Sequence, residues 1–247
     1  MTAPAAQRRA ELAVALDAVR ARIRRACAAA GRQPGEVRLL AVTKTFPATD
    51  AALLVDLGMT DLAENRDQEA AAKAREVAEL RPGSPVRWHM VGRLQRNKVR
   101  SVVRWAAEVQ SVDSPRLVDA LAGAVPAALD AGERNSPLAV LLQASLDDAP
   151  GRGGCPLEEL PALADAVARK SDIFHLRGVM AVAPRGEDPA RAFERLAHAA
   201  QRLRADHPAA TELSAGMSGD LDQAVAYGST CVRVGTALLG GRGLASP

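Results

Sequence analysis

The chain has 247 residues, of which 48% are apolar and 25% are charged, so it can fill a sizeable core and a disordered chain is excluded. Its 32 basic and 29 acidic residues are spread along the sequence, which gives only weak support for nucleic-acid binding. Residues 1–31 lack the continuous apolar core of a signal peptide and no segment approaches a membrane span, so we expect a cytoplasmic protein.

The first predicted element is an amphipathic helix over about residues 5–30. Apolar residues repeat there at helical spacing, at Leu12, Leu16, Val19 and Ile23. This helix precedes the first strand, so we interpret it as an addition to the main fold.

Eight short runs rich in apolar and β-branched residues follow, with helical patterns between them. The predicted strands are Val37–Thr43, Asp61–Glu64, Val86–Val91, Glu108–Val112, Leu138–Ser145, Ile173–Ala181, Thr211–Ser214 and Cys231–Val234. Several of these runs are apolar without alternation, as in a parallel sheet that is covered on both faces. Eight β/α repeats in about 250 residues is the usual size of a closed parallel barrel.

We therefore predict an α/β fold, a single (β/α)8 TIM-like barrel over about residues 36–243, with the extra N-terminal helix before it. A doubly wound open sheet is the alternative architecture. No low-complexity linker divides the chain, so we predict one domain over residues 1–247. Residues 123–137, "GAVPAALDAGERNSP", form the loosest stretch, and Pro126, Gly132 and Pro137 predict a frayed helix and a loop there.

The three cysteines, Cys27, Cys155 and Cys231, are an odd number and lack the spacing of a metal site. Cytosolic proteins keep such thiols reduced. We therefore expect buried free thiols, with neither a disulfide nor a zinc site.

A lysine follows the first predicted strand in "RLLAVTKTFPATD". Alternation along a strand places Leu40, Val42 and Lys44 on one face, so Lys44 is expected to point into the mouth of the barrel. Barrel active sites form at the carboxyl ends of the strands. A lysine with a packed stem and a solvated ammonium is the alternative explanation.

Two glycine-containing turns near the end of the chain form a second signal. Small residues follow Ser214 in "SAGMSGD", and Gly235 and Thr236 follow the last strand. Phosphate sites in barrels often lie between the loops after strands seven and eight, where backbone N–H groups are open to an anion. Either turn alone is more simply explained as a turn, but two adjacent turns facing a lysine favour a phosphate site.

Five segments together resemble the pyridoxal-phosphate homeostasis protein family, also called the proline synthetase co-transcribed family: "LLAVTKTFP", "ENRDQEAAAKA", "WHMVGRLQRNKVR", "LRGVMAVAP" and "LSAGMSGDLDQAVAYGSTCVRVGTALLGGR". The resemblance extends from about residue 8 to residue 243. It implies a barrel similar to the N-terminal domain of alanine racemase. It also implies that pyridoxal 5'-phosphate (PLP) is held as a Schiff base on the lysine that matches Lys44.

The resemblance implies further cofactor-binding residues. Asn65 matches an asparagine near the cofactor ring, and Arg233 matches an arginine that faces the pyridine nitrogen. The remaining predicted cofactor-binding residues lie in the two turns: Ser214, Met217, Ser218, Gly235 and Thr236.

The chemistry of Arg233 favours a carrier over an enzyme. A guanidinium can only donate hydrogen bonds, so the pyridine nitrogen opposite it stays neutral and the ring is a weaker electron sink. We predict a PLP-binding protein of intracellular vitamin B6 homeostasis that acts without turnover. We expect a monomer without nucleic-acid or membrane partners, and PLP-dependent apo-enzymes are candidate partners.

Several alternatives remain at this stage. A PLP-dependent amino-acid racemase or decarboxylase of low activity is the first, and an aldolase that uses Lys44 for substrate imines is the second. His89 in "WHMVG" is a doubtful catalytic base, because a hydrogen-bonded interior histidine explains it equally well. The basic segment "QRNKVR" has Trp105 as its only nearby aromatic residue, which favours a solvated face or a cation beside a phosphate over a nucleic-acid site.

Overall fold

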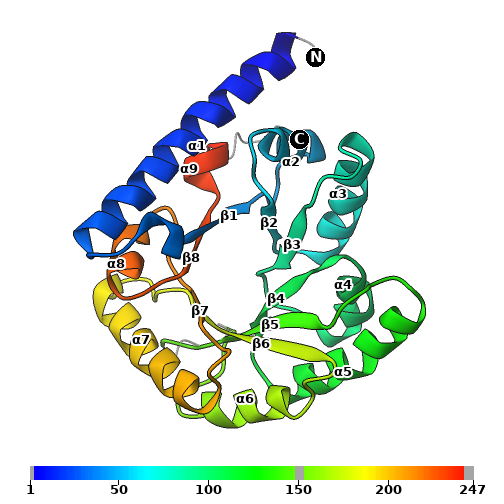
Figure 1. Cartoon of the computed structure of the whole chain (residues 1–247), viewed down its shortest axis with the longest axis vertical. Coiled ribbons are helices and arrows are strands. Elements are labelled where there is room, and N and C mark those ends of the chain that lie inside the picture. Colours follow the sequence, from blue (N-terminus) through cyan, green and yellow to red (C-terminus); the bar gives the residue numbers. More distant parts are fainter. Residues whose placement is uncertain (1–2, 148–152, 242–247) are drawn as a thin grey trace.

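Eight parallel strands form a closed barrel in the computed structural model, which describes residues 3–147 and 153–241 (Figure 1). Strand β8 pairs with β1, and Leu40 lies opposite Arg233 in this pairing. This closure confirms the predicted barrel and excludes the open sheet. The strands are β1 (Arg38–Val42), β2 (Asp61–Glu64), β3 (Arg87–Met90), β4 (Glu108–Val112), β5 (Leu138–Gln143), β6 (Phe174–Met180), β7 (Glu212–Ser214) and β8 (Cys231–Val234).

The predicted boundaries of β2, β4 and β8 match the structure, and the other five strands are one or two residues shorter at an end than predicted. The end of β1 shows the reason. The Thr43 N–H still donates to the Ala63 carbonyl at 3.0 Å, but the chain turns at the next residue. Sheet pairing therefore stops where the loops at the rim begin.

Helices surround the ring of strands (Figure 1). They are α1 (Ala3–Ala29), α2 (Ala48–Asp56), α3 (Asp67–Leu80), α4 (Val99–Trp105), α5 (Pro115–Asp130), α6 (Leu160–Ala168), α7 (Pro189–Asp206), α8 (Leu221–Ala226) and α9 (Thr236–Leu239), with short 3-10 turns at Pro34–Glu36 and Arg96–Lys98. The predicted N-terminal helix is confirmed to within two residues at its start. Among the residues described, no helix combines the length and apolar character needed to cross a bilayer.

Helix α5 ends at Asp130 and a loop follows it, as predicted, but the helix continues through Pro126 and does not fray there. Proline removes one backbone hydrogen bond from a helix interior. The apolar face of α5, which includes Leu121, Val125 and Ala128, is buried against the barrel and holds the helix together across that gap. Tertiary packing therefore overrides the local signal of Pro126.

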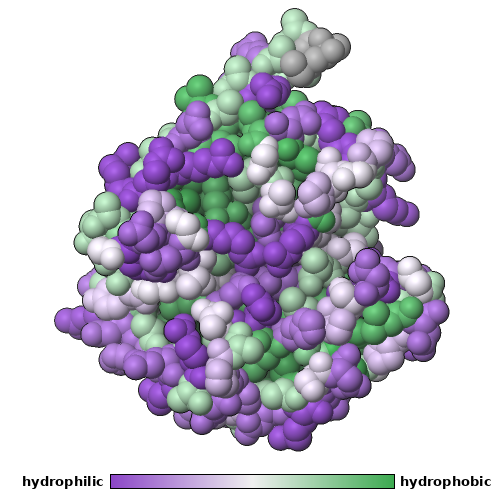
Figure 2. All heavy atoms as spheres, viewed as in Figure 1, coloured by the Kyte–Doolittle hydropathy of each residue, from purple (hydrophilic) through white to green (hydrophobic). Residues whose placement is uncertain are grey.

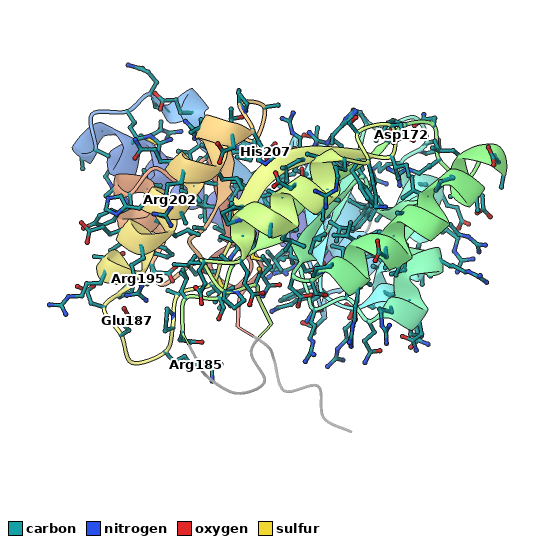
Figure 3. The ribbon with its side chains drawn as sticks, turned by 90° about the horizontal axis from the view of Figure 1, so that it is seen from below. Asp172, Arg185, Glu187, Arg195, Arg202 and His207 are labelled. Carbon is teal, nitrogen blue, oxygen red and sulfur yellow. The ribbon has the colours of Figure 1, made fainter. Side chains whose placement is uncertain are left out.

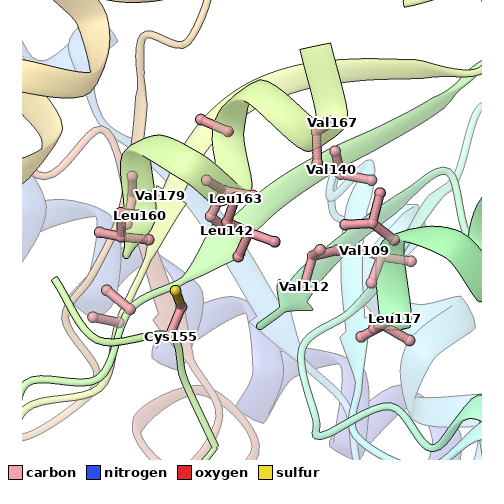
Figure 4. Close-up of a cluster of buried hydrophobic side chains, with 14 of the residues drawn as sticks. Val109, Val112, Leu117, Val140, Leu142, Cys155, Leu160, Leu163, Val167 and Val179 are labelled. Carbon is pink, nitrogen blue, oxygen red and sulfur yellow. The ribbon is translucent and has the colours of Figure 1, made fainter. Parts of the chain in front are cut away.

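An apolar layer joins the strands to the outer helices (Figure 4). Leu142 of β5 and Val179 of β6 share a cluster with Leu160 and Leu163 of α6, and each of these side chains is almost fully buried. Burying a side chain of this size contributes about 1.5–3 kcal/mol. The three cysteines are buried free thiols, and Cys155 packs in this same cluster.

Helix α1 spans the seam where the barrel closes (Figure 1). Arg22 forms an ion pair with Asp222 of α8 at 2.7 Å and donates to the Ser218 carbonyl at 2.6 Å. Arg8 forms an ion pair with Asp50 of α2 at 2.7 Å and donates to the Leu239 carbonyl of α9. The extra helix therefore connects the first repeat of the barrel to the last one.

Charged side chains fill much of the barrel interior, where large barrels usually hold branched apolar residues. Each ring nitrogen of His89 contacts one carboxylate, Asp61 at 2.8 Å and Glu108 at 2.9 Å. Arg38 contacts Asp61 at 2.8 Å and Glu212 at 2.7 Å. Hydrophilic residues also lie over the centre of the ring on the face seen in Figure 2.

This ion cluster shifts the pKa values of its members. Burial alone would lower the pKa of His89, but its hydrogen bonds to Asp61 and Glu108 raise the pKa above its ordinary value. Burial alone would raise the pKa of Glu108, yet His89 and Arg38 lower it to about 2. The imidazolium and the carboxylates therefore stabilise one another's charged forms.

We expect the change His89→Gln to lower the free energy of unfolding by about 1–3 kcal/mol near neutral pH, because Asp61 and Glu108 lose the imidazolium between them and keep only their contacts with arginine. The contribution of His89 is fully present below about pH 6.5, the ordinary histidine pKa, and is lost as the pH rises through the raised folded pKa. Denaturant unfolding of wild type and variant should therefore differ less at about pH 9 than at about pH 6. The exposed His175, changed to glutamine, is the control. A difference that does not depend on pH would contradict the proposed charge on His89.

Candidate functional site

The predicted cofactor-binding residues lie in the last two positions of β7 and β8 or in the loops that follow β1, β2, β7 and β8. Figure 3 shows the two rims of the barrel from the side. Arg185 and Glu187, which follow β6, lie at the lower rim, and Asp172 and His207 lie at the opposite one. The lower rim is therefore the carboxyl end, which is where parallel barrels build their sites.

Lys44 lies in a turn directly after β1, where the Phe46 N–H donates to the Thr43 carbonyl at 3.1 Å. Leu40 and Val42 belong to a small buried cluster together with Ala63 of β2 and Cys231 of β8, so this face of β1 points into the barrel. The side chain of Lys44 is half-buried, and it has no hydrogen-bond or ion-pair partner among the described residues. Its amine is available to a ligand at the rim.

Asn65 follows β2 and is held in place by the close approach of another loop. Gly92, after β3, lies so near that an added Cβ would be 2.2 Å from the Asn65 carbonyl oxygen. The Oδ1 atom of Asn65 is buried and has no partner among the described residues. An unpaired buried amide oxygen is costly unless a donor reaches it, which makes Asn65 a suitable ligand contact.

Arg233 projects from β8 into the barrel and is 5% exposed. Its guanidinium donates to the Ser214 carbonyl at 2.7 Å, to Ser214 Oγ at 2.8 Å and to the Ala181 carbonyl at 2.8 Å. Burial without a carboxylate in hydrogen-bond contact lowers the pKa of Arg233 below its ordinary value. The guanidinium is thus fixed in position from one side by neutral acceptors.

A chain of hydrogen bonds extends from Arg233 into the ion cluster. Ser214 Oγ donates to Gln110 Oε1 at 2.7 Å, and Gln110 Nε2 donates to Glu108 Oε1 at 2.7 Å. Ser214 is therefore occupied with orienting Arg233. Sequence reasoning missed Gln110, because its contact with Ser214 joins residues that are 104 positions apart.

The two predicted phosphate turns lie in contact with each other. Ser218 Oγ accepts a hydrogen bond from the Ala237 N–H at 3.3 Å. The backbone N–H groups of Gly235 and Thr236 have no acceptor within the described part of the chain. Met217 is 38% exposed, and its N–H donates to Asp220 Oδ1. The turns together offer free backbone donors at the rim.

His89 is positioned differently from these residues. It is fully buried, and both of its ring nitrogens contact carboxylates. Neither nitrogen is left to act on a ligand at the rim. The structure therefore places His89 in the interior ion cluster.

A hollow of about 930 Å3 lies beside Asn65 at the same rim, between the loops after β2, β3 and β4. Arg96 and Lys98 of the basic segment "QRNKVR" line it, together with Arg66 and Arg93. The basic segment therefore lies next to the candidate site.

Comparisons with known proteins identify the family. The family model described as alanine racemase, N-terminal domain, matches residues 14–243. The "Pyridoxal phosphate homeostasis protein" of Mycobacterium tuberculosis (strain ATCC 25618 / H37Rv) is 49% identical over 249 residues, which cover 97% of this chain and 96% of that protein. The chain belongs to the pyridoxal phosphate homeostasis protein family.

Two solved structures have the fold of this family member. PipY of Synechococcus elongatus PCC7942, with PLP bound, superposes with a TM-score of 0.75 at 32% identity, covering 93% of this chain and all of that one (100%). A protein described as unknown from Bifidobacterium adolescentis superposes with a TM-score of 0.84 at 30% identity, covering 94% of this chain and 96% of that one. The family resemblance seen in the sequence is thus confirmed along nearly the whole chain.

Proposed function

We propose that this member of the pyridoxal phosphate homeostasis protein family binds PLP as a Schiff base on Lys44 and serves intracellular PLP homeostasis. The observation that carries the proposal is the half-buried amine of Lys44, which has no partner among the described residues. It lies at the carboxyl rim of a barrel whose relative PipY is described with PLP bound.

The residues present at the rim fit this cofactor. Asn65 Oδ1 is a buried acceptor without a partner in the described chain, and Gly235 and Thr236 offer free backbone donors suited to a phosphate. When bound, PLP would supply an aldehyde that can condense with a lysine amine and release water. Lys44 would supply that amine, Asn65 would contact the ring, and the two turns would hold the phosphate.

Arg233 supports a role without turnover. Its donors are fixed by Ser214 and Ala181, and a guanidinium cannot accept a hydrogen bond from a protonated ring nitrogen that it faces. Enzymes that need the cofactor as a strong electron sink place a carboxylate there instead. The chain therefore suits storage or delivery of PLP, with PLP-dependent apo-enzymes as the proposed recipients, and we infer a cytoplasmic monomer.

A weak PLP-dependent enzyme is the second candidate function. Racemisation needs a proton donor on each face of the bound amino acid. The only tyrosine of the chain, Tyr227, precedes β8 and so lies toward the amino rim, opposite Lys44. Because His89 is bound by two carboxylates, neither residue is placed to act as the second base.

The first prediction concerns Lys44. Lys44→Ala should abolish both the visible absorbance band of the bound cofactor and the adduct trapped by borohydride, while thermal unfolding stays close to wild type. The chain has only four lysines, Lys44, Lys73, Lys98 and Lys170, so peptide mapping of the trapped adduct identifies the reactive one directly. Lys98→Ala is the matched control. An adduct that maps to Lys98 would show that the wrong lysine was chosen.

The phosphate turns generate a second prediction. Ser218→Asp places a negative charge beside the proposed phosphate, whereas Ser218→Asn changes the size similarly without the charge. Ser218→Asp should weaken pyridoxine 5'-phosphate by at least about tenfold, or about 1.4 kcal/mol, and leave unphosphorylated pyridoxal nearly unchanged. Calorimetric titration of both ligands measures this. Equal weakening of the two ligands would contradict a phosphate role for this turn.

The proposed absence of turnover is tested with L-alanine in deuterated water. We expect less than one equivalent of D-alanine per PLP-loaded site, because Lys44 can serve as proton donor on only one face of the bound amino acid. The α-proton signal and the D-enantiomer are followed together by NMR and chiral chromatography. Exchange over many equivalents per site would instead establish the weak enzyme.

A further inference from the structure

The turn that carries Lys44 is strained. Thr45, the residue after Lys44, has a φ of 68°, and among the described residues it is the one non-glycine residue with positive φ. This conformation is especially unfavourable for a β-branched side chain. Such strain persists only where the surroundings hold it in place, and it concentrates at functional sites.

A buried lysine on α3 lies beneath this turn. Lys73 is 5% exposed, and its ammonium has three acceptors: the Thr43 carbonyl at 2.8 Å, Glu64 Oε1 at 2.6 Å and Glu69 Oε1 at 3.0 Å. An ammonium has three donors, so Lys73 is fully satisfied. Its first acceptor belongs to the residue directly before Lys44.

The carboxylates of Glu64 and Glu69 connect Lys73 to the turn that contains Lys44. Glu64 Oε1 accepts from the Thr43 hydroxyl at 2.7 Å, and Glu69 Oε1 accepts from the strained Thr45 N–H at 2.6 Å. Both sequence neighbours of Lys44 are thus tied to the same cation. Without Lys73, two closely spaced carboxylates would be left without their shared counter-ion.

We propose that Lys73 is the positioning residue for Lys44: through Glu64 and Glu69 it fixes the strained turn so that the Lys44 amine faces the cofactor aldehyde. This rests on the proposed Schiff base at Lys44. Lys73 itself forms no bond with the cofactor, because its three donors are used within the protein. Among the described residues, no hydrogen bond or ion pair links Lys73, Glu64 or Glu69 to the phosphate turns, which follow β7 and β8.

If Lys73 positions Lys44, its loss should slow covalent capture of the cofactor without weakening binding of the phosphate group. Lys73→Met keeps the length of the apolar stem and removes the charge. We expect it to slow the appearance of the absorbance band and of the borohydride-trapped Lys44 peptide by on the order of tenfold, the factor that corresponds to backbone strain of this kind. The affinity for pyridoxine 5'-phosphate, which has no aldehyde and cannot bond to Lys44, should change by less than about twofold.

Two further variants complete the test. Glu69→Gln weakens the hold on Thr45 while Glu64 remains, so an intermediate slowing is expected even if Lys73→Met folds poorly. Lys170→Met, at a partly exposed lysine far from the turn in sequence, is the control and should behave as wild type.

The outcomes are distinct. Wild-type rates in both Lys73→Met and Glu69→Gln would overturn the positioning role, and so would parallel losses of capture and of pyridoxine 5'-phosphate affinity, which indicate a general structural effect. If wild-type protein itself gives no trapped Lys44 peptide, the proposed function fails, and with it the inference that rests on it.

Discussion

Charged groups buried inside a closed barrel must neutralise one another, because burial removes much of the water that would solvate them. In this protein the compensation is made by His89, which lies between Asp61 and Glu108, and by Arg38, which joins Asp61 to Glu212. These residues come from five different strands. The register of these five strands therefore depends on the contacts within the cluster, since a shift of one strand would leave a buried charge without its partner.

The same cluster determines the orientation of the residue expected to face the cofactor ring. Glu108 is held ionised, so it requires the Nε2 end of Gln110, which leaves Gln110 Oε1 to accept from Ser214. Ser214 Oγ then accepts from Arg233. Each hydrogen bond in this series fixes which group donates in the next one. The Arg233 guanidinium at the carboxyl rim is therefore oriented by the ion pairs of Glu108 near the amino rim.

Much of the fold and part of the site could be predicted from the sequence, because those signals are local. Apolar runs identified the strands to within two residues, and long motifs near Lys44 and Arg233 identified the family. Contacts between distant segments gave no such signal: Gln110 meets Ser214 across 104 residues. Such pairs depend on register and on the stagger of the strands, which alternation alone does not specify. From the sequence alone, Lys73 resembles an ordinary surface residue of a helix, and its burial follows only from the packing of α3 against β2.

The seam crossed by α1 has a consequence for how the chain is made. The first helix emerges from the ribosome before any strand, yet its ion pair with Asp222 joins residues 200 positions apart. Contacts this distant in sequence form late, since the loop between them has to be ordered first. Helix α2 can cover part of the apolar stripe early, but the part that packs on α8 and α9 stays uncovered until the last repeat is synthesised. A nascent chain that stalls before that point carries an exposed surface of the kind that chaperones and proteases recognise.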